Sequence, residues 1–299
     1  MTPIINVGVV GCGYWGPNWA RNLDLLPGCR LKSVCDTDEQ RLQHMRSLFP
    51  TVETHLEFSH FLEDPDLDAI IIATGVRLHH TMGKASLLSG RHVCIEKPIT
   101  SSSAECEELS AIARQMKLVL MAGHTYLYSP VVRRIKRIID SGELGEIRYI
   151  SARRLNLGVF QRDINVAWDL APHDLSIILY LLGESPISVS CRGSCNVFPG
   201  VYDVASMWLA FSQNRSATVQ SSWLDPRKTR EMTIVGSKKM IVYDDLPNQD
   251  KIRIYDARVD APPHYDSFAE FHYAYHYGDV VIPYVKQDEP LKIEGKRPV

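Results

Sequence analysis

The sequence predicts an α/β domain with a parallel, doubly wound sheet, followed by an α+β domain with a large, mostly antiparallel open sheet. From Ile4 to about His124, short apolar runs alternate with amphipathic segments of helix length, which is the pattern of βαβ units. After His124 the strand-like runs follow one another with few helices between them, and such strands form antiparallel or mixed sheets. The 299 residues are therefore expected to fold as two domains, at 1–123 and 124–299.

Six apolar runs of the first part are expected to be strands, at 4–10, 31–36, 52–55, 69–74, 92–96 and 118–122. Because these runs are apolar without alternation, both faces of their sheet are expected to be covered. The segments 38–48 and 103–116 are expected to be helices, since Asp38 can cap the first and serines and acids open the second.

In the second part, helices are expected at 129–140 and at 172–182, where Gly183 ends the second one. The remaining pattern predicts strands at 146–157, 187–195, 201–211, 217–224, 231–235, 240–244, 251–255 and 273–285. A sheet of this size with one uncovered face predicts association with another subunit, as a homodimer or homotetramer.

Composition favours a small-molecule partner. The formal net charge is -2 and no basic run is sustained, so neither nucleic acid nor a membrane surface is favoured. The seven cysteines are scattered, which is typical of reduced thiols in the cytoplasm. The start of the chain lacks a basic leader, and no apolar stretch is long enough to span a bilayer, so a cytoplasmic location is expected.

A G-x-G-x-x-G motif directly follows the first expected strand and precedes a helix pattern, as Gly11-Cys12-Gly13-Tyr14-Trp15-Gly16. Gly11 permits a tight turn, Gly13 lets the backbone approach a pyrophosphate, and Gly16 lets helix and strand pack closely. The phosphates would lie at the positive end of the helix. Glycine clusters are common, and the alternative is that these glycines only form a turn.

Asp36 strengthens the motif because it ends the second strand, twenty residues after Gly16. A carboxylate at this place accepts hydrogen bonds from the ribose hydroxyls of a dinucleotide, so a Rossmann domain is predicted. The same charge repels a 2′-phosphate, which favours NAD over NADP. Arg41 argues for NADP instead, because an arginine on the next helix can face the 2′-phosphate.

With its fifth strand ending in Glu96-Lys97-Pro98, the chain resembles the Gfo/Idh/MocA oxidoreductases over nearly its whole length. Further matching segments are Ala73-Thr74 followed by His79, the turn at 141–147, and Trp168-Asp169-Leu170-Ala171-Pro172-His173-Asp174. Gly75 and Val76 replace the usual proline and asparagine of the cofactor loop. Members continue into a final helix, whereas residues 291–299 form a short basic tail, so that helix is expected to be absent.

The resemblance implies a catalytic set of Lys97, Asp169 and His173. It also implies cofactor contacts beyond the glycines and Asp36, at Tyr14, Trp15, Thr74, His79, Glu96, Lys97 and Trp168. A lone lysine before a proline is otherwise a surface charge, and only the three matched positions together favour catalysis.

The chemistry of these side chains suits the oxidation of an alcohol. Histidine is ordinarily a base near neutral pH, which suits His173 to this role. Lys97 follows a parallel strand at the edge where open α/β sheets bind ligands. Asp169 lies one helical turn before His173 if the helix begins there. Residues before Pro172 can instead be non-helical, and their proximity then rests on the resemblance.

Four polar residues near the catalytic segment are expected to bind the hydroxyls of the substrate, Asn156, Gln161, Arg162 and Asn165. Ordinary loop polarity explains each of them equally well. The histidine pairs His79–His80 and His272–His276 lack a set of carboxylates or cysteines, so no metal is expected.

The leading hypothesis is an NAD-dependent dehydrogenase acting on a ring hydroxyl of a sugar, a nucleotide-linked sugar or a cyclic polyol. Two alternatives remain open. One is an NAD-dependent glycosidase, which the family also contains, and the other is a non-catalytic dinucleotide-binding protein.

Overall fold

The computed structural model describes residues 4–161, 164–246, 250–260 and 274–286, together with Leu291 and Glu294. Two compact units divide the chain: Met1–Thr125 with Glu289–Val299, and Tyr126–Asp288. The expected second domain, 124–299, differs from the second unit at its end, because Leu291 is only 2% exposed and packs with Val7 and Trp19 of the first unit. Leu291 and Glu294 are both in helical conformation. The expected absence of a final helix stays a prediction, because the rest of 291–299 lies outside the described residues.

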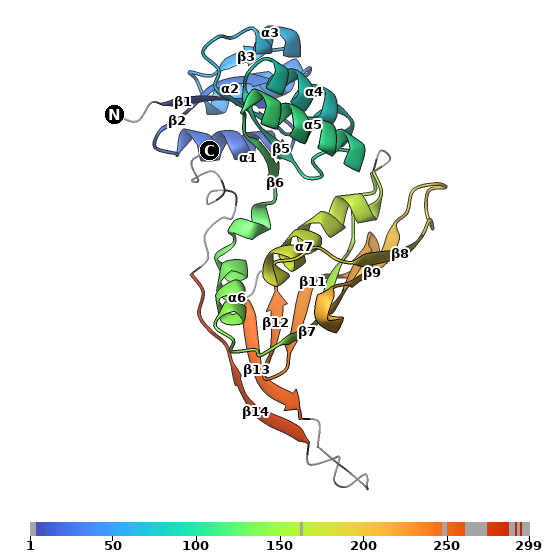
Figure 1. Ribbon diagram of the computed structural model, residues 1–299. Helices are drawn as coiled ribbons and strands as arrows, with labels where there is room; N and C mark the ends of the chain where they lie inside the picture. The colour runs from blue at the N-terminus through green and yellow to red at the C-terminus, as the bar shows by residue number, and fades with distance from the viewer. Residues whose placement is uncertain are drawn as a thin grey trace. The chain divides into compact units, whose positions relative to one another are not determined.

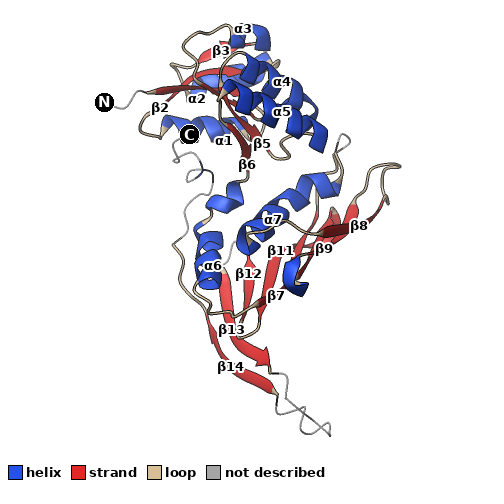
Figure 2. Ribbon diagram, viewed as in Figure 1, coloured by secondary structure: helices blue, strands red, loops and turns tan. Residues whose placement is uncertain are grey.

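The first unit contains a parallel sheet, whose strands are red in Figure 2. Their order is β3-β2-β1-β4-β5-β6. Its strands are β1 Ile5–Val10, β2 Cys29–Cys35, β3 Glu53–His55, β4 Ala69–Ile72, β5 His92–Glu96 and β6 Leu120–Gly123. All six expected strands are present, and the parallel Rossmann sheet is confirmed. The strand order reverses at β1 and β4, so a binding crevice is expected beyond their carboxyl ends.

Helices cover both faces of this sheet. They are α1 Gly16–Asp24, α2 Glu39–Leu48, α3 Phe58–Leu62, α4 Val76–Leu88 and α5 Ser103–Met116. Apolar side chains of α1 and α2 pack with Val9 and Val34 in one core, and those of α3, α4 and α5 pack with Ile70 and Ile95 in another. The Asp38 side chain caps α2 by accepting hydrogen bonds from the N–H groups of Gln40 and Arg41, as its place in the sequence predicts.

The second unit contains a sheet in the order β14-β13-β12-β11-β7-β10-β9-β8. Only β7 and β10 pair in parallel, so the sheet is mostly antiparallel, as predicted. Its strands are β7 Ile147–Leu157, β8 Ser188–Ser194, β9 Val204–Ala210, β10 Ser216–Ser222, β11 Leu224–Gly236, β12 Met240–Asp244, β13 Ile252–Val259 and β14 Tyr275–Val281. The helical segments are η1 Thr125–Tyr128, α6 Pro130–Asp140, α7 Val166–Leu182 and η2 Ser212–Asn214.

Helices α6 and α7 pack on one face of this sheet (Figure 1). Ile135 of α6 and Ile177 of α7 share a core with Ile150 of β7 and Ile234 of β11. Because side chains alternate along a strand, the neighbours of these strand residues point to the opposite face. That face carries Tyr149 and Trp208, which are 44% and 54% exposed.

Helix α7 begins six residues earlier than the sequence predicts, and Pro172 lies inside it. The Asn165 side chain accepts a hydrogen bond from the N–H of Trp168 at 3.1 Å, so it caps the helix from Val166. This cap stabilises the helical turn before Pro172, although residues that precede a proline prefer extended conformations. Asp169 and His173 therefore lie one helical turn apart on the same face of α7.

Candidate active site

The glycine-rich loop joins β1 to α1, and its close backbone contacts require glycine at two places. Gly11 has a φ of +91°, and a Cβ there would lie 2.7 Å from the Ala73 carbonyl. A Cβ on Gly16 would lie 2.0 Å from the Gly11 oxygen. At Gly13 the nearest atom to such a Cβ is Nη1 of Arg41, at 3.9 Å, so this glycine leaves open space beside the start of α1. The loop thus fits a phosphate group at the positive end of a helix.

Asp36 follows β2 and is held against the same loop. Its Oδ2 accepts a hydrogen bond from the Cys12 N–H at 2.7 Å, and its Oδ1 accepts one from the Asp38 N–H at 2.9 Å. Nη1 of Arg41 lies 3.4 Å from Oδ2. Oδ1 keeps a second lone pair, so Asp36 can still accept a hydrogen bond from a ribose hydroxyl.

His79 of α4 connects two loops at the carboxyl edge of the sheet. Its Nδ1 lies 2.9 Å from the Pro98 carbonyl oxygen, and its Nε2 lies 3.0 Å from the Thr74 carbonyl oxygen. Burial lowers the pKa of His79, while the two carbonyl contacts oppose that shift. Because both nitrogens face backbone oxygens, His79 fixes the loops after β4 and β5, and its expected cofactor contact stays a prediction.

Glu96 ends β5 as a buried carboxylate. Its Oε1 accepts a hydrogen bond from Nε1 of Trp19 at 2.7 Å, and its Oε2 accepts one from the Lys97 N–H at 3.2 Å. Burial raises the pKa of this carboxyl group. Glu96 thus ties the end of β5 to α1 and fixes the backbone from which the Lys97 side chain leaves.

In the second unit, two aromatic residues hold the catalytic candidates of α7. The Trp223 indole donates a hydrogen bond from Nε1 to Oδ2 of Asp169 at 3.2 Å. The ring of Tyr126 meets that of His173 edge to face, with centroids 4.9 Å apart and planes at 75°. Neither Trp223 nor Tyr126 was predicted from the sequence, because each comes from a segment far from α7 and carries no motif.

The expected substrate residues lie around the start of α7 and the end of β7. Asn156 is in β7 and Gln161 is exposed in the following loop. Trp168, which is expected to contact the cofactor, is exposed on the first turn of α7. Asn165 uses Oδ1 as the helix cap, which leaves its NH₂ group for a ligand. Arg162 lies outside the described residues. The roles of these residues stay predictions.

The structure thus gathers the predicted residues into one group in each unit. In the first unit the glycine loop, Asp36, Thr74, Glu96 and Lys97 follow the carboxyl ends of parallel strands. In the second unit Asp169 and His173 share one face of α7. A dinucleotide fits the first group, and the second places a carboxylate and an imidazole one helical turn apart.

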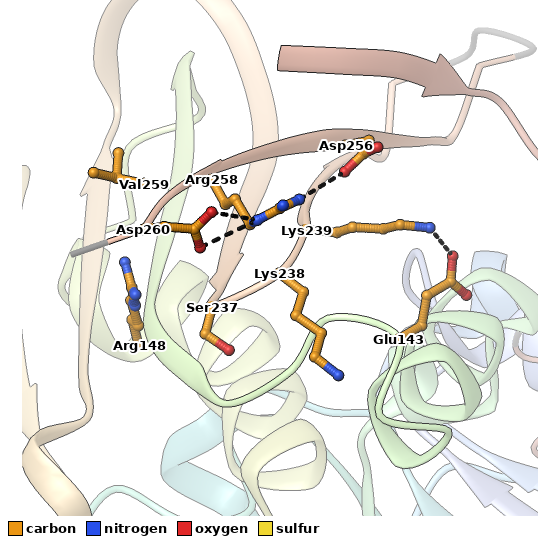
Figure 3. A pocket seen from close by; sticks show the side chains of 9 residues that line it. All are labelled: Glu143, Arg148, Ser237, Lys238, Lys239, Asp256, Arg258, Val259 and Asp260. Carbon is orange, nitrogen blue, oxygen red and sulfur yellow. Dashed lines mark hydrogen bonds and ion pairs between the residues drawn. The ribbon is translucent and has the colours of Figure 1, made fainter. Parts of the chain in front are cut away.

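A separate hollow of about 680 Å³ lies in the second unit (Figure 3). Several of its charged side chains pair with one another: Lys239 with Glu143 at 3.0 Å, and Arg258 with Asp260 at 3.0 Å. No residue predicted for cofactor or catalysis lines it. These internal pairs make it a poor candidate for the reaction site.

The described residues contain neither a metal-binding cluster nor a membrane-spanning helix. In these parts of the chain, no three His, Cys, Asp or Glu side chains are arranged to hold a metal ion. Likewise, none of the described helices is both long and apolar enough to cross a membrane.

Comparison with known proteins agrees with this geometry. Residues 5–124 match the model of an oxidoreductase family with an NAD-binding Rossmann fold, and residues 132–242 match the Gfo/Idh/MocA C-terminal domain. UDP-N-acetylglucosamine 3-dehydrogenase of Acidithiobacillus ferrooxidans is 27% identical over 82% of this chain and 75% of its own. Myo-inositol 2-dehydrogenase of Thermotoga maritima is 22% identical over 98% of this chain and 91% of its own.

The fold comparison gives the same result. The solved structure of the A. ferrooxidans enzyme has a TM-score of 0.77 and 24% identity, covering 99% of this chain and 90% of that one. The two family matches together span most of the chain, across both units. The protein is therefore an oxidoreductase and belongs to the Gfo/Idh/MocA family.

Proposed function

We propose that this protein is an NAD-dependent dehydrogenase that oxidises a secondary ring hydroxyl of a sugar, a nucleotide-linked sugar or a cyclic polyol. The observation that carries the proposal is the pair of Asp169 and His173 on one face of α7, in a chain whose first unit is an NAD-binding fold. The named relatives, a UDP-N-acetylglucosamine dehydrogenase and a myo-inositol dehydrogenase, support the substrate class.

The proposed roles follow from the chemistry of each side chain. NAD at the first unit would supply the acceptor for the hydride that leaves the alcohol carbon. His173 takes the hydroxyl proton, and Asp169 orients the imidazole or binds a neighbouring hydroxyl. Lys97 donates a hydrogen bond to the reacting oxygen. Asn156, Gln161, Arg162 and Asn165 bind the other hydroxyls of the substrate.

The preference for NAD over NADP is part of the proposal. Asp36 accepts from the ribose diol and repels a 2′-phosphate, while its contact with Arg41 partly neutralises that arginine. Tyr14, Trp15, Thr74, His79, Glu96 and Trp168 are proposed to complete the cofactor site. Tyr14 is 80% exposed, so its ring is accessible to a ligand.

Absorbance of NADH during incubation with NAD and a panel of alcohols tests the proposal. The panel contains UDP-N-acetylglucosamine, myo-inositol and free hexoses, with mannitol as an acyclic control. NADH formation with a cyclic alcohol, and none with mannitol, is expected. Release of free sugar from a glycoside without net NADH would indicate a glycosidase instead. Tight NAD binding without turnover of any cyclic alcohol or glycoside would indicate a non-catalytic binder.

We also propose that the protein is a cytoplasmic homodimer or homotetramer that associates through the uncovered face of the second sheet. That face exposes Tyr149 and Trp208, and all seven cysteines are free thiols, as in a reducing compartment. Light scattering is expected to give a dimer or tetramer, and Trp208→Glu is expected to lower the mass. A monomeric wild-type protein at working concentration would contradict the association.

A further inference from the structure

A buried ion pair lies beneath the catalytic candidates of the second unit. Arg154 of β7 and Asp174 of α7 are each 4% exposed. Nε and Nη2 of Arg154 donate to the two carboxylate oxygens of Asp174, both at 2.9 Å. Two parallel hydrogen bonds of this kind fix the guanidinium plane, so Arg154 is a rigid element in the core.

Tyr126 lies on this guanidinium group. The Arg154 Cζ atom is 5.0 Å from the centroid of the Tyr126 ring, within the range of a cation–π contact. The Tyr126 hydroxyl also lies 3.5 Å from Nη1 of Arg154 and 3.5 Å from Nη1 of Arg230. Two arginines thus hold the ring and its hydroxyl, and Arg230 is itself 3.7 Å from Asp245.

The Tyr126 ring that the two arginines hold also contacts His173. The rings of Tyr126 and His173 meet edge to face at 4.9 Å. His173 also precedes Asp174 on α7, so the ion pair anchors the backbone next to His173. The imidazole is therefore constrained from two directions, through its ring and through its helix.

We propose that Tyr126 is a positioning residue for His173: Arg154 and Asp174 fix the Tyr126 ring, and the ring fixes the imidazole in the orientation that takes the proton. This inference rests on the proposed role of His173 as the base. A general base must reach the hydroxyl with its nitrogen aligned, and a displacement of about 1 Å can slow a reaction about a hundredfold. A rigid neighbour that limits ring rotation therefore acts on turnover more than on binding.

The contact is tested first without any substrate. NMR spectra of the ligand-free protein are compared for wild type, Tyr126→Phe and Tyr126→Leu, with His173→Gln identifying the imidazole signals. Tyr126→Phe keeps the ring and should leave the His173 shifts and titration nearly unchanged. Tyr126→Leu removes the ring current and should move the shifts and change the titration curve. Tyr126→Met replaces the leucine variant if circular dichroism shows that the latter is unfolded.

Kinetics then test the consequence. The assay uses NAD with the cyclic alcohol that the panel above identifies, beginning with UDP-N-acetylglucosamine. For Tyr126→Leu, kcat should fall by between about tenfold and about a hundredfold, with a changed pH profile and little change in KM or NAD affinity. Tyr126→Phe should stay within about twofold of wild type, because the ring contact is retained.

The outcomes separate this inference from the proposed function. If His173→Gln abolishes turnover but Tyr126→Leu keeps the wild-type kcat and pH profile, the positioning role is wrong and the proposed function stands. If His173→Gln turns over normally, the proposed base is wrong and the positioning role falls with it. Unchanged His173 shifts and titration in Tyr126→Leu overturn the inference even without a substrate.

Discussion

Replacement of Asp36 by alanine tests the cofactor site at its most specific contact. The carboxylate of Asp36 has three neighbours in the structure: the N–H groups of Cys12 and Asp38, and the guanidinium of Arg41. Asp36→Ala removes the acceptor for the ribose diol and leaves Arg41 without this acidic partner. NAD affinity should therefore fall, while discrimination against NADP should weaken.

The size of the effect follows from the bonds that are lost. A hydrogen bond to a charged group contributes about 1.5–3 kcal/mol, and about 1.4 kcal/mol corresponds to a tenfold change in affinity. The dissociation constant for NAD should rise by between about 10-fold and about 150-fold. The buried N–H of Cys12 also loses its acceptor, which should lower the free energy of unfolding by about 1–3 kcal/mol.

Titration calorimetry with NAD and with NADP measures both parts of this prediction. Glu39→Ala is a matched control, because it removes an acid that pairs with Arg46 and does not contact Asp36 or Arg41. In the double variant Asp36→Ala/Arg41→Ala, NADP affinity should fall again, since Arg41 would face the 2′-phosphate. If the wild-type protein binds NADP more tightly than NAD, or if Asp36→Ala keeps the ratio of the two affinities, the reasoning is refuted.

Three further predictions concern the loop, the buried ion pair and the C-terminal segment. Gly16→Ala should abolish NAD binding in calorimetry, because its Cβ would lie 2.0 Å from the Gly11 oxygen; unchanged binding would contradict the tight loop. Arg154→Met should lower the free energy of unfolding in urea by about 3–5 kcal/mol, since it leaves the Asp174 charge buried and unpaired; a loss below about 1 kcal/mol would refute this. Burial raises the pKa of Glu294 from 4.5 to about 8, so the charged form destabilises the fold as pH rises across this window. Glu294→Gln should therefore raise the melting temperature at pH 8 but not near pH 4.5, and an equal effect at both would count against it.

Much of the fold could be predicted from local pattern alone. The central residues of runs such as 69–74 and 92–96 are apolar without alternation, which is typical of a buried parallel strand between helical segments. The strand order at β1 and β4 then places the glycine loop and Lys97 at the binding edge. These features were accessible because each depends on neighbouring residues in the sequence.

The rest depends on a helix cap that overrides a local preference and on contacts between distant segments. The start of α7 was missed because the Asn165 cap outweighs the local effect of Pro172, and Asn165 was interpreted as a substrate residue only. The tail was assigned to the second domain, since nothing in its sequence indicates that Leu291 packs with Val7. One signal was available in the sequence of β7. Arg154 lies on the same face of this strand as Ile150 and Ala152, which face the core. A charge at a core-facing position predicts a buried partner, and Asp174 is that partner.

The central claim is that Lys97, Asp169 and His173 carry out hydride-coupled proton transfer in an NAD-dependent oxidoreductase. The most direct measurement is the turnover of His173→Ala and Lys97→Ala on the identified substrate, with NAD affinity determined on the same preparations. Each variant should lose about a hundredfold or more in kcat, the usual contribution of a positioned acid or base, while NAD affinity changes much less. If the double variant Lys97→Ala/His173→Ala turned over the substrate at the wild-type rate, the proposed catalytic site would be in the wrong place.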